Sequence, residues 1–231
     1  MSSRTLHLDL GRAGYEGVLR LQRELHARRC EATIPDAVIT VEHDPVFTIG
    51  RSGSLDHLLV ERERLDAEGI GLCEVERGGD ITYHGPGQLV VYPIVDLRQR
   101  GRDVKRFITD LEETAIRTLR VFGIDGGRRP GYPGVWVAAP PAALAPGTYK
   151  IASIGVYVKQ WVTRHGLALN VAVNPEHFAM IRPCGLDVAA VSTNDLLVRA
   201  VSLGRVRDAF LAEMAGVFGW AFETASPEEI G

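Results

Sequence analysis

The segment from residue 88 to residue 97 most constrains the fold, because nearly all of its side chains are apolar. It reads Gln-Leu-Val-Val-Tyr-Pro-Ile-Val-Asp-Leu, without the alternation of a strand that has one face in water. The run is typical of a strand buried on both faces. Pro93 lacks a backbone N–H and predicts a bulge or a loss of pairing at one edge of this strand.

The rest of the chain mixes helical and strand patterns. Apolar residues at three- and four-residue spacing predict helices at about 15–29, 103–122 and 205–218, the second capped by Asp103. Strands are predicted at 5–10, 37–41, 46–49, 134–138, 151–159 and 166–173. This mix predicts one α+β domain over residues 1–231, with helices packed on a mixed or largely antiparallel sheet. The proline-rich stretch 138–147 predicts a loop, either a surface insertion or a cover over the site.

Composition excludes several classes of protein. The 231 residues are 45% hydrophobic and 24% charged, which is typical of a soluble globular enzyme. A net charge of −3 with scattered basic residues gives no reason to expect a nucleic acid or a membrane as partner. No apolar run approaches the ~18 residues of a spanning helix, and the N-terminus lacks a signal-peptide core. We therefore expect a cytoplasmic protein.

Three cysteines, Cys30, Cys73 and Cys184, argue against a disulfide scaffold, and none has metal-ligand spacing. A free cysteine is commonly a small buried hydrophobe, which suits Cys30 and Cys73. Cys184 stands between Pro183 and Gly185, where the backbone must be irregular and can bring N–H groups close to an oxyanion. Cys184 is therefore a candidate nucleophile.

Lys150 is the candidate partner of this thiol. Lysine occurs only at positions 105, 150 and 159, although the chain holds 26 lysines and arginines. Unlike arginine, lysine can release its proton, and an ammonium group near a thiol favours the thiolate. Lys105 fits the solvent face of its helix and Lys159 ends a strand, which leaves Lys150 at the start of Lys-Ile-Ala-Ser-Ile-Gly.

The glycine-rich segment 77–88 reads Arg-Gly-Gly-Asp-Ile-Thr-Tyr-His-Gly-Pro-Gly-Gln. Such a backbone can lie against a ligand or present N–H groups to an anion. The alternative is a tight hairpin between the strands around Cys73 and Leu89, with His84 as a hydrogen-bonded structural residue. The segment matches neither common nucleotide-binding signature. Residues 165–170 combine a histidine, a glycine and small side chains that would admit a slender ligand.

Four motifs in this order closely resemble the octanoyltransferases of lipoate biosynthesis, the LipB family. They are RGGDITYHGPGQ at 77–88, KIASIG at 150–155, HGLALNV at 165–171 and PCG at 183–185. TIGR at 48–51 and GVWV at 134–137 add smaller matches. The resemblance covers about residues 5–220 and implies the α+β fold of the biotin and lipoate protein ligases.

The resemblance also implies roles for single residues. Cys184 would form an acyl-thioester, and Lys150 would lower the pKa of that thiol and transfer protons. His84 would position the acyl group or take part in a general-acid network. The residues implied to line the acyl site are Arg77, Gly78, Gly79, Asp80, Ile81, Thr82, Tyr83, His84, Ser153, Ile154, Gly155, Gly166, Leu167 and Ala168.

The implied reaction transfers octanoyl from octanoyl-acyl carrier protein to a specific lysine of lipoyl domains, as the first step of endogenous lipoate biosynthesis. The acceptors would be the lipoyl domains of 2-oxoacid dehydrogenase E2 subunits and the glycine cleavage H protein. The enzyme would act as a monomer. Because exchange between thioesters is nearly isoenergetic, the reaction needs no ATP, and we expect no cofactor and no metal.

Two other interpretations use the same scaffold. An ATP-dependent lipoate or biotin protein ligase would need an adenylate site and no nucleophilic thiol, so Cys184 and the His-Gly-Pro-Gly run argue against it. A non-catalytic module that binds acyl chains or carrier protein would need neither Cys184 nor Lys150, so the presence of both residues argues against it.

We predict that Lys150→Arg keeps the positive charge but loses most turnover, because arginine does not release its proton at neutral pH. Cys184→Ala is expected to abolish acyl capture. Steady-state transfer of octanoyl to a lipoyl domain measures both variants, with Lys105→Arg as the matched control. Transfer at the wild-type rate by Cys184→Ala would refute the cysteine mechanism.

Overall fold

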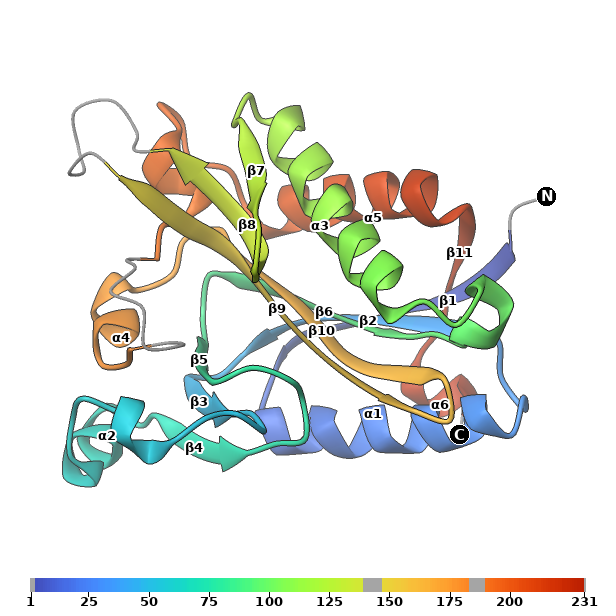
Figure 1. Cartoon of the computed structure of the whole chain (residues 1–231), viewed down its shortest axis with the longest axis horizontal. Coiled ribbons are helices and arrows are strands. Elements are labelled where there is room, and N and C mark those ends of the chain that lie inside the picture. Colours follow the sequence, from blue (N-terminus) through green and yellow to red (C-terminus); the bar gives the residue numbers. More distant parts are fainter. Residues whose placement is uncertain (1–2, 139–146, 183–189, 231) are drawn as a thin grey trace.

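The computed structural model describes residues 3–138, 147–182 and 190–230. Cys184 and residues 139–146 of the proline-rich stretch lie outside these ranges (Figure 1). The helices are α1 (Tyr15–Cys30), α2 (Arg62–Glu68), α3 (Val104–Val121), α4 (Pro175–Ala179), α5 (Leu203–Phe218) and α6 (Pro227–Ile230). The strands are β1 (Ser3–Ala13), β2 (Asp36–His43), β3 (Val46–Ile49), β4 (Gly71–Glu74), β5 (Ile81–His84), β6 (Gln88–Ile94), β7 (Gly126–Arg129), β8 (Tyr132–Ala138), β9 (Thr148–Lys159), β10 (Val162–Asn170) and β11 (Trp220–Thr224).

Among the described residues, eight strands form one mixed sheet in the order β11-β1-β2-β6-β10-β9-β8-β7. The strands β11, β1 and β2 run parallel, and the pairs from β2 to β7 are antiparallel. The predicted α+β fold with a mixed sheet is confirmed. The central strand is β6, and every residue in it is buried, as the apolar run predicted, although Leu97 belongs to a short 3-10 turn beyond it.

Pro93 ends the pairing of β6 on one side, as its missing N–H predicted. The register with β2 continues through Pro93 to Ile94. The register with β10 stops at Val91, opposite Leu167. Beyond this point the Thr163 hydroxyl donates to the Pro93 carbonyl oxygen over 2.6 Å, so a side chain of β10 replaces part of the backbone ladder.

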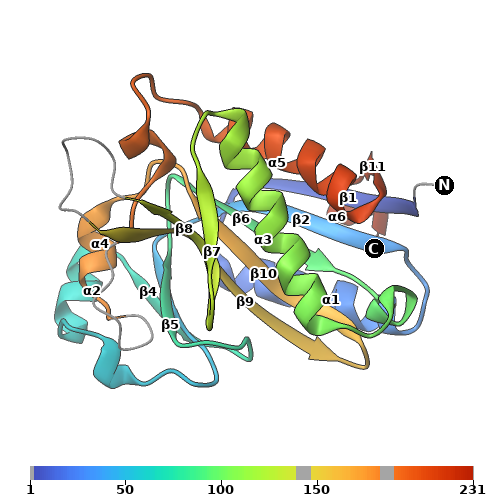
Figure 2. The same ribbon diagram turned by 45° about the horizontal axis from the view of Figure 1, so that its top comes forward.

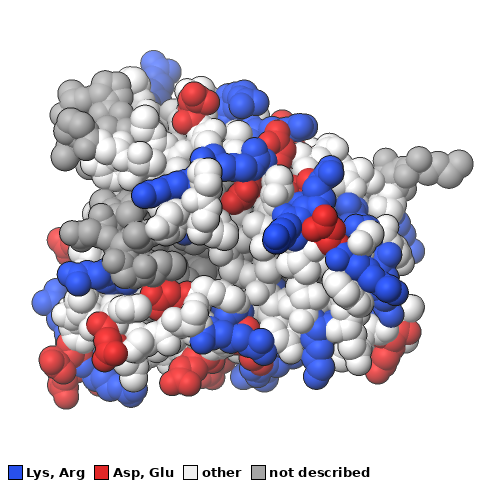
Figure 3. Space-filling model, viewed as in Figure 1, with Lys and Arg blue, Asp and Glu red and all other residues white. Residues whose placement is uncertain are grey.

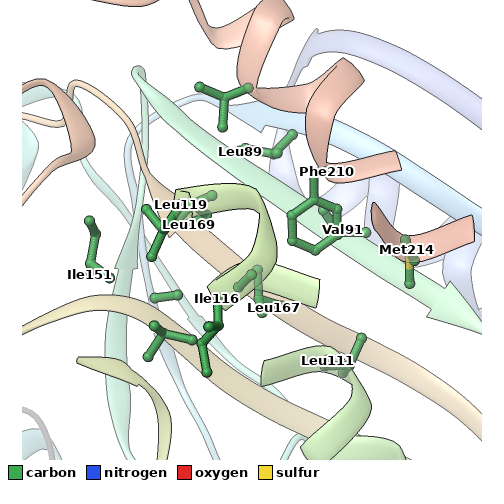
Figure 4. Packing of buried hydrophobic residues seen from close by; sticks show 14 of the residues in the cluster. Leu89, Val91, Leu111, Ile116, Leu119, Ile151, Leu167, Leu169, Phe210 and Met214 are labelled. Atoms are coloured by element: carbon green, nitrogen blue, oxygen red, sulfur yellow. The ribbon is translucent and has the colours of Figure 1, made fainter. Parts of the chain in front are cut away.

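Two helices, α3 and α5, lie side by side on one face of the sheet (Figures 1 and 2). As predicted, Asp103 caps α3, and its side chain accepts from the Arg106 backbone N–H over 2.9 Å. The apolar stripe of α3 meets α5 and the strands β6, β9 and β10. Figure 4 shows the residues at this contact: Leu89, Val91, Leu111, Ile116, Leu119, Ile151, Leu167, Leu169, Phe210 and Met214.

The opposite face of the sheet is covered by α1, which connects the parallel strands β1 and β2 (Figure 1). Val18 and Leu25 of this helix belong to the same buried cluster as Ile39 and Tyr92. The helix ends at Cys30, close to the predicted end at Arg29. The two faces of β6 therefore belong to two separate hydrophobic clusters, one under α3 and α5 and one under α1.

The hairpin interpretation of residues 77–88 is wrong. Within the described residues, β3 pairs with β4 in parallel and with β5 in antiparallel orientation, which makes a separate three-stranded sheet. The strand β5, formed by part of the glycine-rich segment, therefore pairs with β3, and β4 does not pair with β6. Phe47, Ile81 and Tyr83 form the core of this small sheet together with Met180.

The strand predicted at 166–173 starts earlier, at Val162, and ends at Asn170. Gln160 and Trp161 have φ values of 53° and 63°, and Lys159 pairs with Val162 around them. Positive φ at both central residues is typical of a two-residue type I′ hairpin turn. The sequence concealed this turn because it carries no asparagine or glycine at these positions.

Cys30 and Cys73 are free thiols and only partly buried, so their interpretation as core residues is only partly right. Burial raises the pKa of both thiols, which keeps them protonated near neutral pH. On the face shown in Figure 3, Lys and Arg side chains are interspersed with Asp and Glu side chains, as the scattered basic residues predicted. No helix within the described residues is long and apolar enough to cross a membrane.

Leu111→Ala is expected to lower the free energy of unfolding by about 2–5 kcal/mol, because Leu111 is fully buried between α3, α5 and the sheet. Val198→Ala, at a fully exposed position, should change it by less than about 0.5 kcal/mol. Urea unfolding followed by circular dichroism measures both variants. Equal stabilities for the two variants would contradict this view of the core.

Candidate active site

A cavity of about 880 Å³ is lined in part by residues of β5, β9 and β10, and its volume is within the roughly 300–1,000 Å³ of small-molecule sites. All site residues predicted from the sequence and described by the structure line it, except Tyr83. Lys150 is among them. Further apolar residues of the lining are Leu59, Val90, Ile108, Pro133, Val156, Pro175, Phe178 and Ile181.

Lys150 reaches the cavity because of an irregularity between β8 and β9. Trp136 pairs with Lys150 and Val135 pairs with Ala152, so Ile151 is an extra residue on β9. Such a bulge changes which face the following side chains occupy. Ile151 and Ala152 both join the core under α3 and α5, while Lys150 and Ser153 both line the cavity.

Backbone hydrogen bonds hold the Arg-Gly-Gly-Asp run against β9 and against Gly50, the residue that follows β3. Gly78 N donates to Val156 O over 2.9 Å, and Gly50 N donates to Asp80 O over 3.2 Å. A Cβ atom on Gly155 would lie 2.9 Å from Gly78 O and 3.1 Å from Arg77 Cδ, which is closer than side chains pack. The glycines of these two motifs therefore bring two backbones together at the cavity wall.

Arg77 crosses from this run to β3. Its Nη2 donates to both the carbonyl oxygen and the Oγ1 of Thr48, over 2.6 and 2.8 Å. The guanidinium is largely buried and lines the cavity. Asp80 is also buried, accepts from the Ile81 N–H over 2.7 Å, and lies 2.6 Å from Nδ1 of His57. Two charged groups of opposite sign thus face the cavity from one loop.

His84 is a neutral, hydrogen-bonded histidine. Gln88 Nε2 donates to Tyr83 O and to Asn170 Oδ1, so Gln88 Oε1 is left to accept from His84 Nδ1, over 2.7 Å. Nε2 of His84 therefore carries a lone pair. Burial first, and then the nearby His43, lower the pKa of His84 to about 3. At neutral pH this ring can accept a hydrogen bond but is not an imidazolium acid.

His165 lies within β10 with a φ of 57°, a conformation that is strained for a histidine. Its backbone N–H donates to Gln22 Oε1 over 3.0 Å, and its Nε2 lies 3.8 Å from Glu76 Oε2. Burial, followed by Arg77 and Arg164, lowers the pKa of His165 to about 3. A second neutral imidazole therefore lines the cavity.

Tyr83 is the described residue of the predicted set that the cavity lining lacks, because its side chain points away from the cavity. Side chains alternate along a strand, and Tyr83 lies on the opposite face of β5 from Thr82 and His84. It packs on Phe47, and its hydroxyl lies 2.7 Å from Nδ1 of His177. Burial raises the pKa of Tyr83 to about 12.

The described residues on either side of the segment 183–189 both lie at this cavity. Ile181 forms a bridge with Leu58, and Arg182 N donates to His57 O over 2.9 Å. On the other side, Val191 N donates to Lys150 O over 3.2 Å. Ile181, Arg182 and Ala190 line the cavity. Cys184 lies outside the described residues.

Sequence reasoning missed several residues of the lining. Tyr92 and Val90 lie on the cavity side of β6, and Trp136 comes from β8. Asn170 lines the cavity and accepts from Gln88. The run around Tyr92 is apolar throughout and carries no sign of which face meets a cavity. Trp136 had a signal in the Gly-Val-Trp-Val match.

Comparison with known proteins gives the family. The lipoyl protein ligase A/B catalytic domain matches residues 15–215. An octanoyltransferase of Solibacter usitatus is 44% identical over 210 residues, which cover 91% of each chain. An octanoyltransferase of Caldicellulosiruptor saccharolyticus is 42% identical over 219 residues, covering 94% of this chain and 89% of that one. The chain belongs to the octanoyltransferase family.

This octanoyltransferase-family chain is accordingly an acyltransferase, related to lipoate attachment through the ligase A/B domain. A bipartite lipoate protein ligase of Thermoplasma acidophilum has the same fold, with a TM-score of 0.72 at 18% identity over 100% of this chain and 90% of that one. The predicted kinship in fold with lipoate ligases is confirmed. At this identity the likeness concerns the fold alone.

The buried histidines make the stability of the enzyme depend on pH. The pKa is about 3 for His84 and His165, and about 4 for His43, which burial lowers in the same way. In the unfolded chain these rings take up protons below about pH 6.5. Stability is therefore complete above pH 6.5 and falls as the pH drops toward 4, by about 1.4 kcal/mol per pH unit for each ring.

Urea unfolding at pH 7.5, 6.0 and 5.0 measures this loss. His84→Gln removes one of the rings, so the free energy of unfolding should fall with decreasing pH by about 1.4 kcal/mol per pH unit less than in the wild type. NMR of the ring Cε1 protons provides the independent control. Three histidines that do not titrate between pH 8 and 5 are expected. Titration of His43, His84 and His165 near pH 6.5 would show that these rings are not buried as neutral bases.

Proposed function

We propose that this enzyme transfers octanoyl from octanoyl-acyl carrier protein to a specific lysine of lipoyl domains, through a thioester on Cys184. The proposed acceptors are the lipoyl domains of 2-oxoacid dehydrogenase E2 subunits and of the glycine cleavage H protein. The proposed enzyme acts as a single catalytic domain and a monomer in the cytoplasm. The observation that carries the proposal is that residues of the three described motifs, at 77–88, 150–155 and 165–171, line one cavity together, Lys150 among them.

The cavity suits an acyl chain that ends at a reactive carbonyl. Apolar side chains such as Val90, Leu167 and Phe178 supply much of its lining, and Lys150, Arg77 and His84 supply polar groups. Burial of an octanoyl chain contributes about 0.8 kcal/mol per methylene. The described residues Arg182 and Ala190, on either side of the segment that carries Cys184, also line it.

The first step begins from the Cys184 thiolate and the Lys150 ammonium. The thiolate attacks the carbonyl carbon of the donor thioester, and the bond from that carbon to the pantetheine sulfur breaks. The departing sulfur takes the proton of Lys150 and leaves as a thiol. The products are an octanoyl thioester on Cys184 and a neutral Lys150.

The second step restores the starting state. The neutral amine of the target lysine attacks the Cys184 thioester, and Lys150 accepts the proton that this amine loses. The carbon–sulfur bond breaks, the octanoyl amide is formed, and Cys184 leaves as a thiolate beside the Lys150 ammonium. One thioester is consumed and one amide is made, without an energy source beyond the donor thioester.

The lone pair on His84 Nε2 supports a positioning role for this residue. With a pKa of about 3, a neutral imidazole can accept a hydrogen bond from a donor group of the substrate or from the incoming amine. The general-acid role follows less readily from an imidazole that stays unprotonated near neutral pH. We therefore assign His84 to positioning.

Intact-protein mass after mixing with octanoyl-acyl carrier protein, without ATP, tests the proposal. We expect a single octanoyl adduct on the wild type, none on Cys184→Ala, and discharge of the adduct when a lipoyl domain is added. Cys30→Ala and Cys73→Ala are the matched controls, because both thiols are partly buried and outside the cavity lining; both should form the adduct.

Other outcomes would favour the rival functions. Modification of a lipoyl domain only in the presence of octanoate and ATP would make the protein an ATP-dependent ligase. Binding of the carrier protein without any transfer would make it a binding module. Either result would overturn the thioester mechanism.

A further inference from the structure

The Lys150 side chain lies across a backbone position that admits only glycine. A Cβ atom on Gly134 would lie 2.7 Å from Lys150 Cε and 3.4 Å from Lys150 Nζ, and it would also overlap the carbonyl oxygen of Ala152. Gly134 has a φ of 130°, which side chains rarely allow. The lysine stem therefore occupies the space that any other residue at 134 would fill.

The end of the same side chain meets an aromatic ring. Lys150 Nζ lies 5.2 Å from the ring centroid of Trp136, within the range of a cation–π contact. The ring is itself fixed, because Trp136 Nε1 donates to Tyr132 O over 3.1 Å and the Arg129 guanidinium packs 5.1 Å from its centroid. A ring held by these two contacts can define where the ammonium group lies.

A buried carboxylate fixes the backbone beneath the lysine. Glu112 of α3 accepts from Gly134 N over 3.0 Å with Oε1, and from Arg128 Nε over 3.1 Å with Oε2. The carboxylate is mostly buried. This bond ties β8 to α3 at Gly134, the residue that the Lys150 stem contacts.

We propose that Gly134, Trp136 and Glu112 are positioning residues that form a seat for the Lys150 ammonium. The inference rests on the proposed function, in which Lys150 gives a proton to the leaving sulfur and takes one from the target amine. Both transfers require the nitrogen within hydrogen-bond reach of the reacting atoms. The bulge between β8 and β9 brings the lysine to the cavity, and the seat fixes its stem and its charged end.

The test is the single-turnover rate of acyl capture from octanoyl-acyl carrier protein, read by intact-protein mass at saturating donor. Gly134→Ala should slow capture on the order of 100-fold, the effect of displacing a catalytic group by about 1 Å. The KM for the donor should not change, since Gly134 itself is not part of the cavity lining. Glu112→Gln, which keeps an acceptor oxygen, should retain more activity than Glu112→Ala.

Trp136 provides a second and independent variant pair. Trp136→Leu removes the π face and should slow capture about 10-fold, within the range of a cation–π contact. Trp136→Phe keeps an aromatic face and should restore most of the rate, a rescue that a purely structural role would not produce. Gly123→Ala is the matched control for backbone strain, since Gly123 also has a positive φ, of 78°, but nothing lies within 4 Å of the added Cβ.

Each result decides the question. A folded Gly134→Ala that captures octanoyl at the wild-type rate overturns the seat. If Gly134→Ala does not fold, the Trp136 pair decides, and equal rates for Phe and Leu overturn it. If the wild-type protein forms no adduct, both the proposed function and the positioning role of the three residues are refuted. If the wild type forms the adduct and the variants capture octanoyl at the wild-type rate, only the positioning role is refuted.

Discussion

Burial of β6 on both faces is the constraint on which the rest of the structure depends. A strand whose residues are all buried needs apolar cover on both sides, which α3 and α5 provide on one face and α1 on the other. The sheet must then extend from β6 in both directions, through β2 and through β10. The cavity lies beside β9 and β10, where the Arg-Gly-Gly-Asp run contacts β9 through the hydrogen bond from Gly78 N to Val156 O.

Irregular backbone in β9 determines which side chains reach the cavity. A regular β9 would alternate its side chains and bury either Lys150 or Ser153, whereas the extra residue Ile151 sends both to the cavity. The glycine at 155 lets the next motif lie directly on the strand. Strand irregularities and close backbone contacts are common next to active sites because they re-aim side chains without disturbing the core.

The cavity also has an unusual charge distribution. Its histidines are neutral, because burial and nearby cations lower the pKa of His84 and His165 to about 3. Among the described residues of the lining, Lys150, Arg77 and Arg182 carry positive charges. A cationic amine in the same cavity as neutral imidazoles suits the proposed reaction, in which a thiolate is formed, consumed and formed again. Because the folded state keeps these imidazoles neutral, the free energy of unfolding falls at low pH.

The amino-acid sequence by itself determined the mixed α+β sheet, the bounds of the main helices to within a few residues, the central buried strand and the motifs that resemble the octanoyltransferases. The helices and strands follow from local periodicity and capping, which a short window of residues contains, whereas the motifs were identified by their resemblance to the family. The tertiary structure alone decided that residues 81–84 pair with β3, that Gln160 and Trp161 form a hairpin turn, and that Tyr83 faces away from the cavity. It also decided that Trp136 and Glu112 meet the backbone and side chain around Lys150. Strand partners, side-chain facing and contacts between α3 and β8 join residues far apart in the chain, and no local pattern records which distant segment fills the space beside a given side chain.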